Sequence, residues 1–280
     1  MKDGRLRVGV VAPGSRIDPV LAERLGALAG RIYGDRAPDI HVHPQCFLSH
    51  GHFAGDDAAR GEAFLDIAND PEIDALWFAR GGYGSCRLLE TILPRLTEAA
   101  RAKTYLGYSD AGSLLGALYG QGVANIVHGP MPVDLERAGG VQAVARALAW
   151  LVDRDPGVLE PSLADGAPAA AFNLTILSEL MGTPFQPDLA GHVLMLEEVS
   201  EYHYSIDRDF FHVTSHPAMR AVAGIRLGRC SAIPANVPDF GQNEDEIARY
   251  WCARSGIAYL GRADIGHDVD NKIVPFGQRG

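Results

Sequence analysis

The first candidate for chemistry is a serine at the end of an apolar run. The segment 107–111, GYSDA, follows an apolar strand candidate and precedes the apolar stretch AGSLLGALYG. This order predicts a tight strand-to-helix turn that exposes the Ser109 hydroxyl at the carboxyl end of a sheet. The helix N-terminus and the backbone N–H of Asp110 could then stabilise an oxyanion formed beside it. Ser and Asp before a helix are also common N-caps, so the local pattern allows both interpretations.

A glycine-rich segment forms the second candidate. Residues 80–84, RGGYG, directly follow the strand candidate IDALWFA of residues 73–79. Three glycines in four positions let the backbone turn sharply and approach a ligand, so their N–H groups could complete an oxyanion hole. The spacing matches neither the dinucleotide fingerprint nor the phosphate loop, so nucleotide binding is not supported. A plain turn is the alternative interpretation.

Acidic and imidazole groups follow later in the chain. Glu197 and Glu198 end the apolar run VLML, and Glu201 comes shortly afterwards. Such a cluster is also typical of a solvated strand end. His267 lies near the C-terminus in a loop, where a histidine can be a base or a hydrogen-bonded surface residue.

Four histidines in one short stretch raise the question of zinc. They are His41, His43, His50 and His52. Their H-x-H spacing is familiar from zinc sites, but Pro44, Gly51 and the absence of Cys or Glu at metal spacing argue against one. A metal also needs ligands held on a rigid element, and this stretch resembles a strand leading into a loop. We therefore expect no metal at these histidines.

The elements that would position these residues alternate between strand and helix. This alternation predicts an α/β fold whose N-terminal domain, residues 1–155, has a mostly parallel sheet with helices on both faces and carries the nucleophile turn. The expected strands are 6–12, 40–43, 73–79, 103–108 and 124–128, and the expected helices are 19–28, 56–67 and 110–118.

A smaller C-terminal α/β domain is expected over residues 172–280. Residues 156–171 are rich in Pro, Gly, Ala and Asp without periodicity, which favours a linker. Beyond it we expect strands at 192–197 and 222–227 and helices at 173–181, 206–215 and 244–255.

Composition narrows the function classes. The chain has 280 residues and a formal net charge of −10, which disfavours binding to nucleic acid or to an anionic membrane. The N-terminus has no apolar run long enough for a signal peptide or a membrane span, so we expect a cytoplasmic protein. The four cysteines are scattered, as in a reduced compartment.

Several ordered segments together resemble the LD-carboxypeptidase family, the Ser-Glu-His serine peptidases that trim murein tetrapeptides, also called muramoyltetrapeptide carboxypeptidases. The resemblance spans nearly the whole chain. It rests on VGVVAPGS, DIANDPEIDALWFARGGYGSCRLL, YLGYSDAGSLL, VHGPM, FNLTILSELMGTP, VLMLEEVSEYHYSIDRDF and GHDVDNKIVPFG.

The resemblance implies a catalytic triad assembled across both domains. It implies Ser109 as nucleophile, Glu197 as acidic member and His267 as base. Two departures concern this assignment: the family more often has Asp at position 198 and Thr or a similar residue near 112. Glu198 therefore stays open as the acidic partner. The C-terminal tail is also short, ending soon after PFGQRG.

The same resemblance implies the binding groups and the substrate. The oxyanion donors would be the N–H groups of Asp110 and of the glycine turn, where Gly82 is preferred over Gly81. A guanidinium would suit the terminal carboxylate of the substrate, and Tyr83 could cover the cleft. The candidate arginines for this role are Arg80, Arg87 and Arg208.

The implied reaction releases the terminal D-alanine from murein tetrapeptides during cell-wall recycling, without metal or organic cofactor, in an enzyme that is a homodimer. The partner is thus a small peptide substrate. Two alternatives remain: an antibiotic-immunity peptidase that cleaves peptidyl-nucleotide or aminoacyl-nucleotide amides, and a non-catalytic muropeptide sensor.

Overall fold

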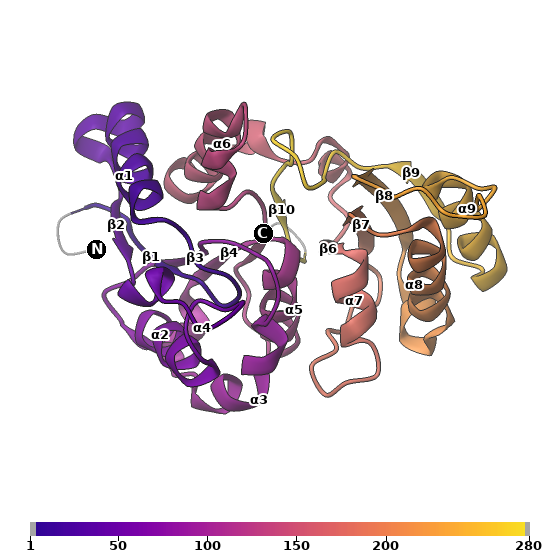
Figure 1. Cartoon of the computed structure of the whole chain (residues 1–280), viewed down its shortest axis with the longest axis horizontal. Helices are drawn as coiled ribbons and strands as arrows, with labels where there is room; N and C mark the ends of the chain where they lie inside the picture. The colour runs from indigo at the N-terminus through magenta and orange to yellow at the C-terminus, as the bar shows by residue number, and fades with distance from the viewer. Residues whose placement is uncertain (1–3, 278–280) are drawn as a thin grey trace.

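The computed structural model describes residues 4–277, which form two β-sheets flanked by helices (Figure 1). The strands are β1 (Arg7–Val11), β2 (Asp39–Val42), β3 (Ala75–Phe78), β4 (Thr104–Gly107), β5 (Ile126–His128), β6 (Ala169–Asn173), β7 (Val193–Val199), β8 (Gly224–Ser231), β9 (Tyr259–Arg262) and β10 (Val274–Pro275). The first sheet has the order β10-β5-β4-β3-β1-β2, with only β10 antiparallel to its neighbour among the described strands. The second sheet has four parallel strands in the order β6-β7-β8-β9.

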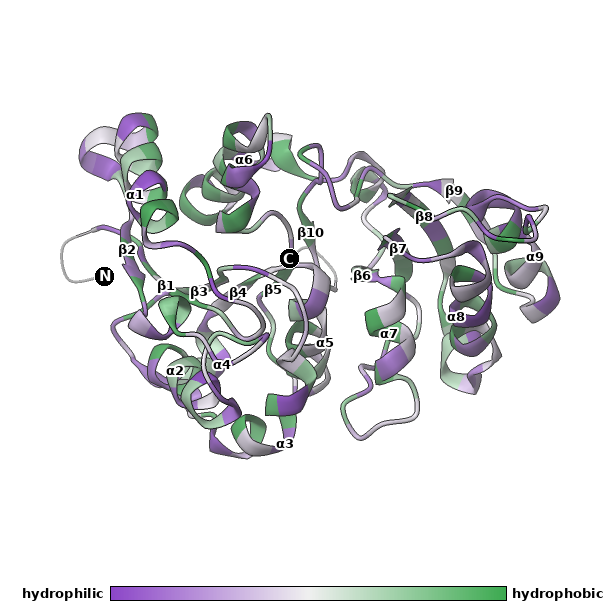
Figure 2. Cartoon of the chain, viewed as in Figure 1, coloured by the Kyte–Doolittle hydropathy of each residue, from purple (hydrophilic) through white to green (hydrophobic). Residues whose placement is uncertain are grey.

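Helices cover both faces of the first sheet. They are α1 (Pro19–Tyr33) and α6 (Gly140–Asp153) on one face, and α2 (Asp57–Asn69), α3 (Leu89–Ile92), α4 (Glu98–Ala102) and α5 (Gly112–Gly120) on the other (Figure 1). The second sheet is accompanied by α7 (Leu174–Leu180), α8 (His203–Ser215) and α9 (Glu244–Ser255). Helix α7 packs between α5 and α8, so it joins the two halves. Figure 2 shows the pattern behind this layering, because α1 and α6 alternate between hydrophobic and hydrophilic colours around their circumference.

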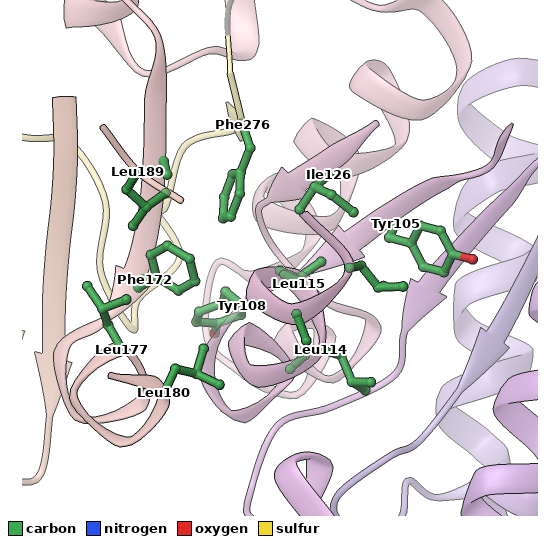
Figure 3. Close-up of a cluster of buried hydrophobic side chains, with 14 of the residues drawn as sticks. Tyr105, Tyr108, Leu114, Leu115, Ile126, Phe172, Leu177, Leu180, Leu189 and Phe276 are labelled. Atoms are coloured by element: carbon green, nitrogen blue, oxygen red, sulfur yellow. The ribbon is translucent and has the colours of Figure 1, made fainter. Parts of the chain in front are cut away.

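An apolar core runs across both sheets. Figure 3 shows Tyr108 and Leu115 from the first half close to Phe172 and Leu180 from the second. Phe276 fills the space between the sheets, with its ring centroid 5.1 Å from that of Phe172. Buried aromatic pairs of this kind add to the stabilisation from area burial. The relative position of the two sheets is therefore fixed by packing.

The architecture confirms the α/β fold with a mostly parallel first sheet and a second, smaller sheet. Several features differ from the expectation. Helices α3, α4 and α6 and strand β9 have no counterpart among the predicted elements. In addition, β6 begins at Ala169 inside the segment 156–171, and β10 returns from the C-terminal part to pair with β5. The return strand is two residues long, and its pattern is too short to carry a periodicity.

Candidate active site

Ser109 lies in the turn between β4 and α5, in a short 3₁₀ helix that covers Ser109–Ala111. Its φ is 60°, in the left-handed region that a non-glycine residue adopts only under constraint. The constraint comes from Asp110, whose buried carboxylate accepts hydrogen bonds from the Gly84 N–H at 3.1 Å, the Ser85 N–H at 3.1 Å and the Ser85 hydroxyl at 2.6 Å. These bonds tie the serine turn to the glycine-rich loop.

The three residues predicted to form a catalytic triad lie in one hydrogen-bonded line. His267 Nε2 is 2.9 Å from Ser109 Oγ, and His267 Nδ1 is 2.5 Å from Glu197 Oε2. Glu197 is fully buried and the His267 side chain is only 7% exposed, whereas Ser109 is partly open to solvent. An acid, a base and a hydroxyl in this order can take the proton of the hydroxyl as it attacks a carbonyl.

The neighbouring glutamate points the other way. Successive residues of a strand face opposite sides of the sheet, so Glu197 and Glu198 of β7 cannot both reach His267. The Glu198 carboxylate accepts bonds from Asn173 Nδ2 at 2.6 Å, Thr175 N–H at 2.9 Å, Thr175 Oγ1 at 2.8 Å and Val199 N–H at 2.8 Å. Glu198 thus anchors the start of α7 to β7.

Burial and charge oppose each other at His267. Burial lowers the pKa of the His267 imidazole because the charged form loses solvation, but the carboxylate of Glu197 favours that form. The attraction and the hydrogen bond to Glu197 prevail, so the pKa of His267 lies above its usual value. Burial also raises the pKa of the Glu198 carboxyl, while its hydrogen bonds from Val199 and Asn173 act in the opposite direction.

The glycine-rich loop leaves room directly beside the serine. A β-carbon added to Gly81 would lie 2.7 Å from Ser109 Oγ, so any side chain there would collide with the hydroxyl. One added to Gly82, which has a φ of 104°, would lie 2.4 Å from Ser15 Oγ. Neither glycine N–H donates a hydrogen bond to another residue within the described part of the chain. Both N–H groups therefore stay available to a ligand.

A polar cluster that the sequence analysis missed supports the His267 ring. The Tyr108 ring lies 4.9 Å from that of His267, and its hydroxyl donates to Asp134 Oδ1 at 2.9 Å. Arg137 Nη1 donates to the backbone carbonyl of His267 at 2.8 Å and contacts Asp134 at 3.1 Å. Because Arg137 holds the backbone carbonyl of His267 and is itself held by Asp134, these contacts limit movement of the imidazole.

Two further residues that were not predicted from the sequence, His128 and Asn271, also hold the loop of His267. Asn271 is fully buried, and its Oδ1 accepts from the Gly266 N–H at 3.2 Å and lies 3.1 Å from Nε2 of buried His128. Desolvation lowers the pKa of His128 to about 4, although Glu197 opposes this, so the imidazole is neutral at physiological pH. Their only sequence signal is that both lie in segments carrying the family resemblance, VHGPM and GHDVDNKIVPFG.

Two family models match this chain. A model described as the LD-carboxypeptidase N-terminal domain matches residues 8–129, and one for the LD-carboxypeptidase C-terminal domain matches residues 168–280. The chain belongs to the LD-carboxypeptidase family. It is a serine-type carboxypeptidase, a hydrolase of peptide bonds.

Individual relatives agree with this family membership. The murein tetrapeptide carboxypeptidase of Pseudomonas aeruginosa is 27% identical over 297 residues, which cover 97% of this chain and 91% of the relative. The muramoyltetrapeptide carboxypeptidase structure from Oxalobacter formigenes has a TM-score of 0.77 at 21% identity, covering 96% and 93% of the two chains. The microcin C7 self immunity protein MccF in complex with aspartyl sulfamoyl adenosine has a TM-score of 0.75 at 16% identity, covering 98% and 96%. At these identities the two structures establish the shared fold.

The proposed substrate-binding side chains lie at different places in the enzyme. Arg80 is exposed beside the glycine loop, where its Nη1 lies 3.4 Å from the Arg16 carbonyl oxygen. Tyr83 is 47% exposed next to the ring of Phe53. The structure does not bring Arg208 to these two, because Arg208 lies on α8 over the ring of Tyr204, with 5.9 Å from its guanidinium carbon to the ring centroid. Arg87 instead forms an ion pair with Asp57 at 2.7 Å.

The histidine group of residues 41–52 is dispersed over β2 and the loop that follows it. His43 accepts from the Gln45 N–H at 3.2 Å, and His52 Nε2 lies 3.4 Å from Ser15 Oγ. Over residues 4–277, no three His, Cys, Asp or Glu side chains gather in a way that could hold a metal ion. In the same range, no helix is long and apolar enough to cross a membrane.

Proposed function

We propose that this enzyme removes the terminal D-alanine from murein tetrapeptides, with Ser109 as nucleophile, His267 as general base and Glu197 as the acidic member. The observation that carries the assignment is the continuous line from Glu197 Oε2 through His267 to Ser109 Oγ, with distances of 2.5 and 2.9 Å. An amide is a poor electrophile, so a serine hydroxyl attacks it only when a base takes its proton during the attack.

The reaction then follows from the positions of these groups. Ser109 Oγ bonds to the scissile carbonyl carbon while its proton passes to His267 Nε2, and Glu197 stabilises the imidazolium and keeps its Nδ1–H oriented. The tetrahedral oxyanion accepts hydrogen bonds from the N–H groups of Asp110 and Gly82, each worth about 3 kcal/mol in the transition state. His267 returns the proton to the departing amine, and a water molecule hydrolyses the acyl-enzyme by the same route.

The substrate assignment rests on the relatives. The Pseudomonas aeruginosa homologue, aligned over 97% of this chain, is named a murein tetrapeptide carboxypeptidase. In a murein tetrapeptide the bond concerned joins the L-centre of meso-diaminopimelate to a terminal D-alanine. The triad accounts for the hydrolysis but is neutral about the substrate, so substrate choice has to come from the surrounding pocket.

One rival substrate class has specific support. The fold is shared with MccF, whose structure was determined with an aspartyl sulfamoyl adenosine bound. A peptidase of this class would hydrolyse the amide of an aminoacyl nucleotide with the same three side chains. Aminoacyl sulfamoyl adenosines therefore belong in the same substrate panel as murein peptides.

Mass spectrometry of purified peptides tests the proposal. Wild type and Ser109→Ala are each incubated with murein tetrapeptide, with tripeptide as the matched substrate that lacks the terminal D-alanine. We expect the loss of one alanine from the tetrapeptide with wild type only. Turnover by Ser109→Ala would refute the nucleophile. An intact tetrapeptide together with a cleaved sulfamoyl adenosine would transfer the activity to the immunity class, and binding without cleavage of either would indicate a sensor.

A further inference from the structure

A hollow of about 310 Å³ opens at the carboxyl edge of the first sheet, outside the triad. Its charged walls come from four residues and its apolar floor from Ile17 and Phe47. The charged residues are Arg16, Asp18, Arg80 and Glu136. A space of this size holds an amino-acid side chain with its head group.

The topology of the sheet makes this a favoured place for a ligand. The order β2-β1-β3-β4-β5 means that the chain leaves β1 and β3 toward opposite sides, and the hollow lies over the ends of these two strands. Open α/β sheets bind ligands in the crevice at such a reversal of strand order. The neighbouring strand, β4, leads into Ser109, so the crevice over β1 and β3 begins one strand away from the strand that carries the nucleophile, a lateral step of about 5 Å.

Two residues of the hollow are adjacent in sequence to residues that contact the triad. Arg80 precedes Gly81, whose missing side chain faces Ser109 Oγ. On the opposite wall, Glu136 precedes Arg137, which holds the backbone carbonyl of His267. A ligand in the hollow would therefore lie beside the substrate bond and not in a separate compartment.

The charged side chains of the hollow make few contacts with the rest of the described chain. Arg80 reaches only the Arg16 carbonyl, at 3.4 Å, and Asp18 accepts only the Val20 N–H that starts α1, at 2.8 Å. Within residues 4–277, none of the four charged side chains forms an ion pair, whereas Arg87 and Arg229 elsewhere are paired. Two guanidinium groups and two carboxylates in one hollow match a ligand that carries both charges.

We propose that this hollow binds the zwitterionic α-amino acid end of the substrate's diamino acid side chain, with Arg16 and Arg80 on its carboxylate and Glu136 on its ammonium group. The inference rests on the proposed function. In meso-diaminopimelate, four carbon–carbon bonds separate the two α-carbons, a span of about 5 Å. That span is comparable to the lateral step between the neighbouring strands β4 and β3, so a substrate with its scissile carbonyl at Ser109 can extend its far head group toward the hollow.

The terminal D-alanine fits the hollow less well. Its carboxylate carries a single negative charge, which the guanidinium groups would attract and the carboxylates of Asp18 and Glu136 would repel. A zwitterionic head group offers a carboxylate to Arg16 and Arg80 and an ammonium group to Glu136, while Asp18 caps the start of α1. The same hollow would distinguish diaminopimelate from lysine, which offers the ammonium group but lacks the second carboxylate.

The test compares two tetrapeptides, one with meso-diaminopimelate and one with L-lysine at the third position, in wild type, Arg16→Gln, Arg80→Gln and Glu136→Gln. Arg31→Gln is the matched control, because Arg31 is exposed in the last turn of α1, about 18 Å along the helix from the hollow. We expect both pocket arginine variants to lose roughly 10- to 100-fold in kcat/KM on the diaminopimelate peptide and little on the lysine peptide. Glu136→Gln should weaken both peptides, and the control neither.

Two results would overturn the proposal: equal losses on both peptides in both arginine variants, or no loss in either. Calorimetry with free meso-diaminopimelate gives a reading that does not depend on turnover. Binding that weakens in Arg16→Gln and Arg80→Gln but not in Arg31→Gln supports the hollow, and absence of binding to wild type contradicts it. If wild type cleaves neither peptide, the proposed function fails, and the calorimetry still decides whether the hollow takes a zwitterion.

Discussion

Exchanging the two adjacent glutamates one at a time should separate catalysis from folding. In Glu197→Gln the amide oxygen can still accept the His267 Nδ1–H, so the ring keeps its orientation while the negative charge is lost. The other oxygen of Glu197, Oε1, is buried and has no hydrogen-bond partner among the described residues, so the amide nitrogen that replaces it breaks no bond. We therefore expect Glu197→Gln to fold, with a loss in the free energy of unfolding of about 1 to 3 kcal/mol at most, because its amide nitrogen lacks an acceptor.

The loss of activity can be worked from the geometry. His267 Nδ1 and Glu197 Oε2 are 2.5 Å apart, which places the centres of the two charges about 4 Å from each other. At an effective dielectric constant of about 20, the attraction is about 4 kcal/mol. The imidazolium forms as the serine attacks, so removing this attraction should lower kcat by about a thousandfold at most.

The pH profile supplies an independent reading. His267 acts as a base only when it is neutral, and Glu197 holds its pKa above the usual value, so wild-type kcat/KM should rise with pH and level off above that pKa. Glu197→Gln leaves the effect of burial and removes the attraction. The acidic limb should therefore move to lower pH, with a lower plateau. A limb that moves to higher pH would refute this reasoning.

Glu198→Gln is the matched control. Its carboxylate accepts four hydrogen bonds, and an amide nitrogen in place of one oxygen would face donors such as the Thr175 N–H. Each buried donor left unsatisfied costs about 1 to 3 kcal/mol, so the free energy of unfolding should fall by about 2 to 4 kcal/mol. Urea titration measures this loss, while kcat should stay near that of wild type. If Glu198→Gln abolished turnover and Glu197→Gln did not, the acidic member would be Glu198.

Three further substitutions test other parts of the site. Gly81→Ala would place a methyl group 2.7 Å from Ser109 Oγ, so kcat should fall at least about a hundredfold, and the collision should lower the free energy of unfolding by about 1 to 3 kcal/mol; activity near wild type would contradict the close approach. Asp110→Asn disturbs the bonds to the Ser85 N–H and hydroxyl, so the free energy of unfolding should fall by about 1 to 3 kcal/mol in urea titration. An unfolding curve identical to that of wild type would contradict this role of Asp110. Phe276→Ala empties the junction of the two sheets and should cost about 3 to 5 kcal/mol in the same assay; a loss under about 1 kcal/mol would mean that the sheets are held in another way.

The alternation of strands and helices was readable from the sequence because each buried strand is a short apolar run that ends in glycine or a polar turn. The helix at 244–255 was predicted with its observed bounds, since acidic residues open it and Gly256 follows it. Helix α6 was missed although Ala143, Ala147 and Leu148 repeat at helical spacing. Its N-terminus has no Ser, Thr, Asp or Asn cap, because Gly139 occupies that position.

At the active site, too, local patterns could be predicted from the sequence, whereas contacts between distant segments could not. A serine turn and a glycine loop are local patterns, and the sequence could indicate both. The choice between Glu197 and Glu198 depends on which face of β7 meets the loop of His267, and that depends on packing of the second sheet. Asn271 and Arg137 act through backbone groups of that loop, and no local pattern marks a side chain that holds a distant carbonyl or N–H.

The position of His267 explains how residues 158 apart in the chain come within hydrogen-bonding distance. After β9 the chain stays attached to the second sheet, where Arg229 binds Asp268 at 2.5 Å, and then crosses to the first sheet, where β10 pairs with β5. The histidine lies on this crossing segment, with Glu197 from the second sheet on one side and Ser109 from the first on the other. Because each sheet supplies one neighbour and one anchor, the geometry of the triad depends on the packing that joins the sheets. A substitution at that junction should therefore reduce catalysis even where it touches no reacting atom.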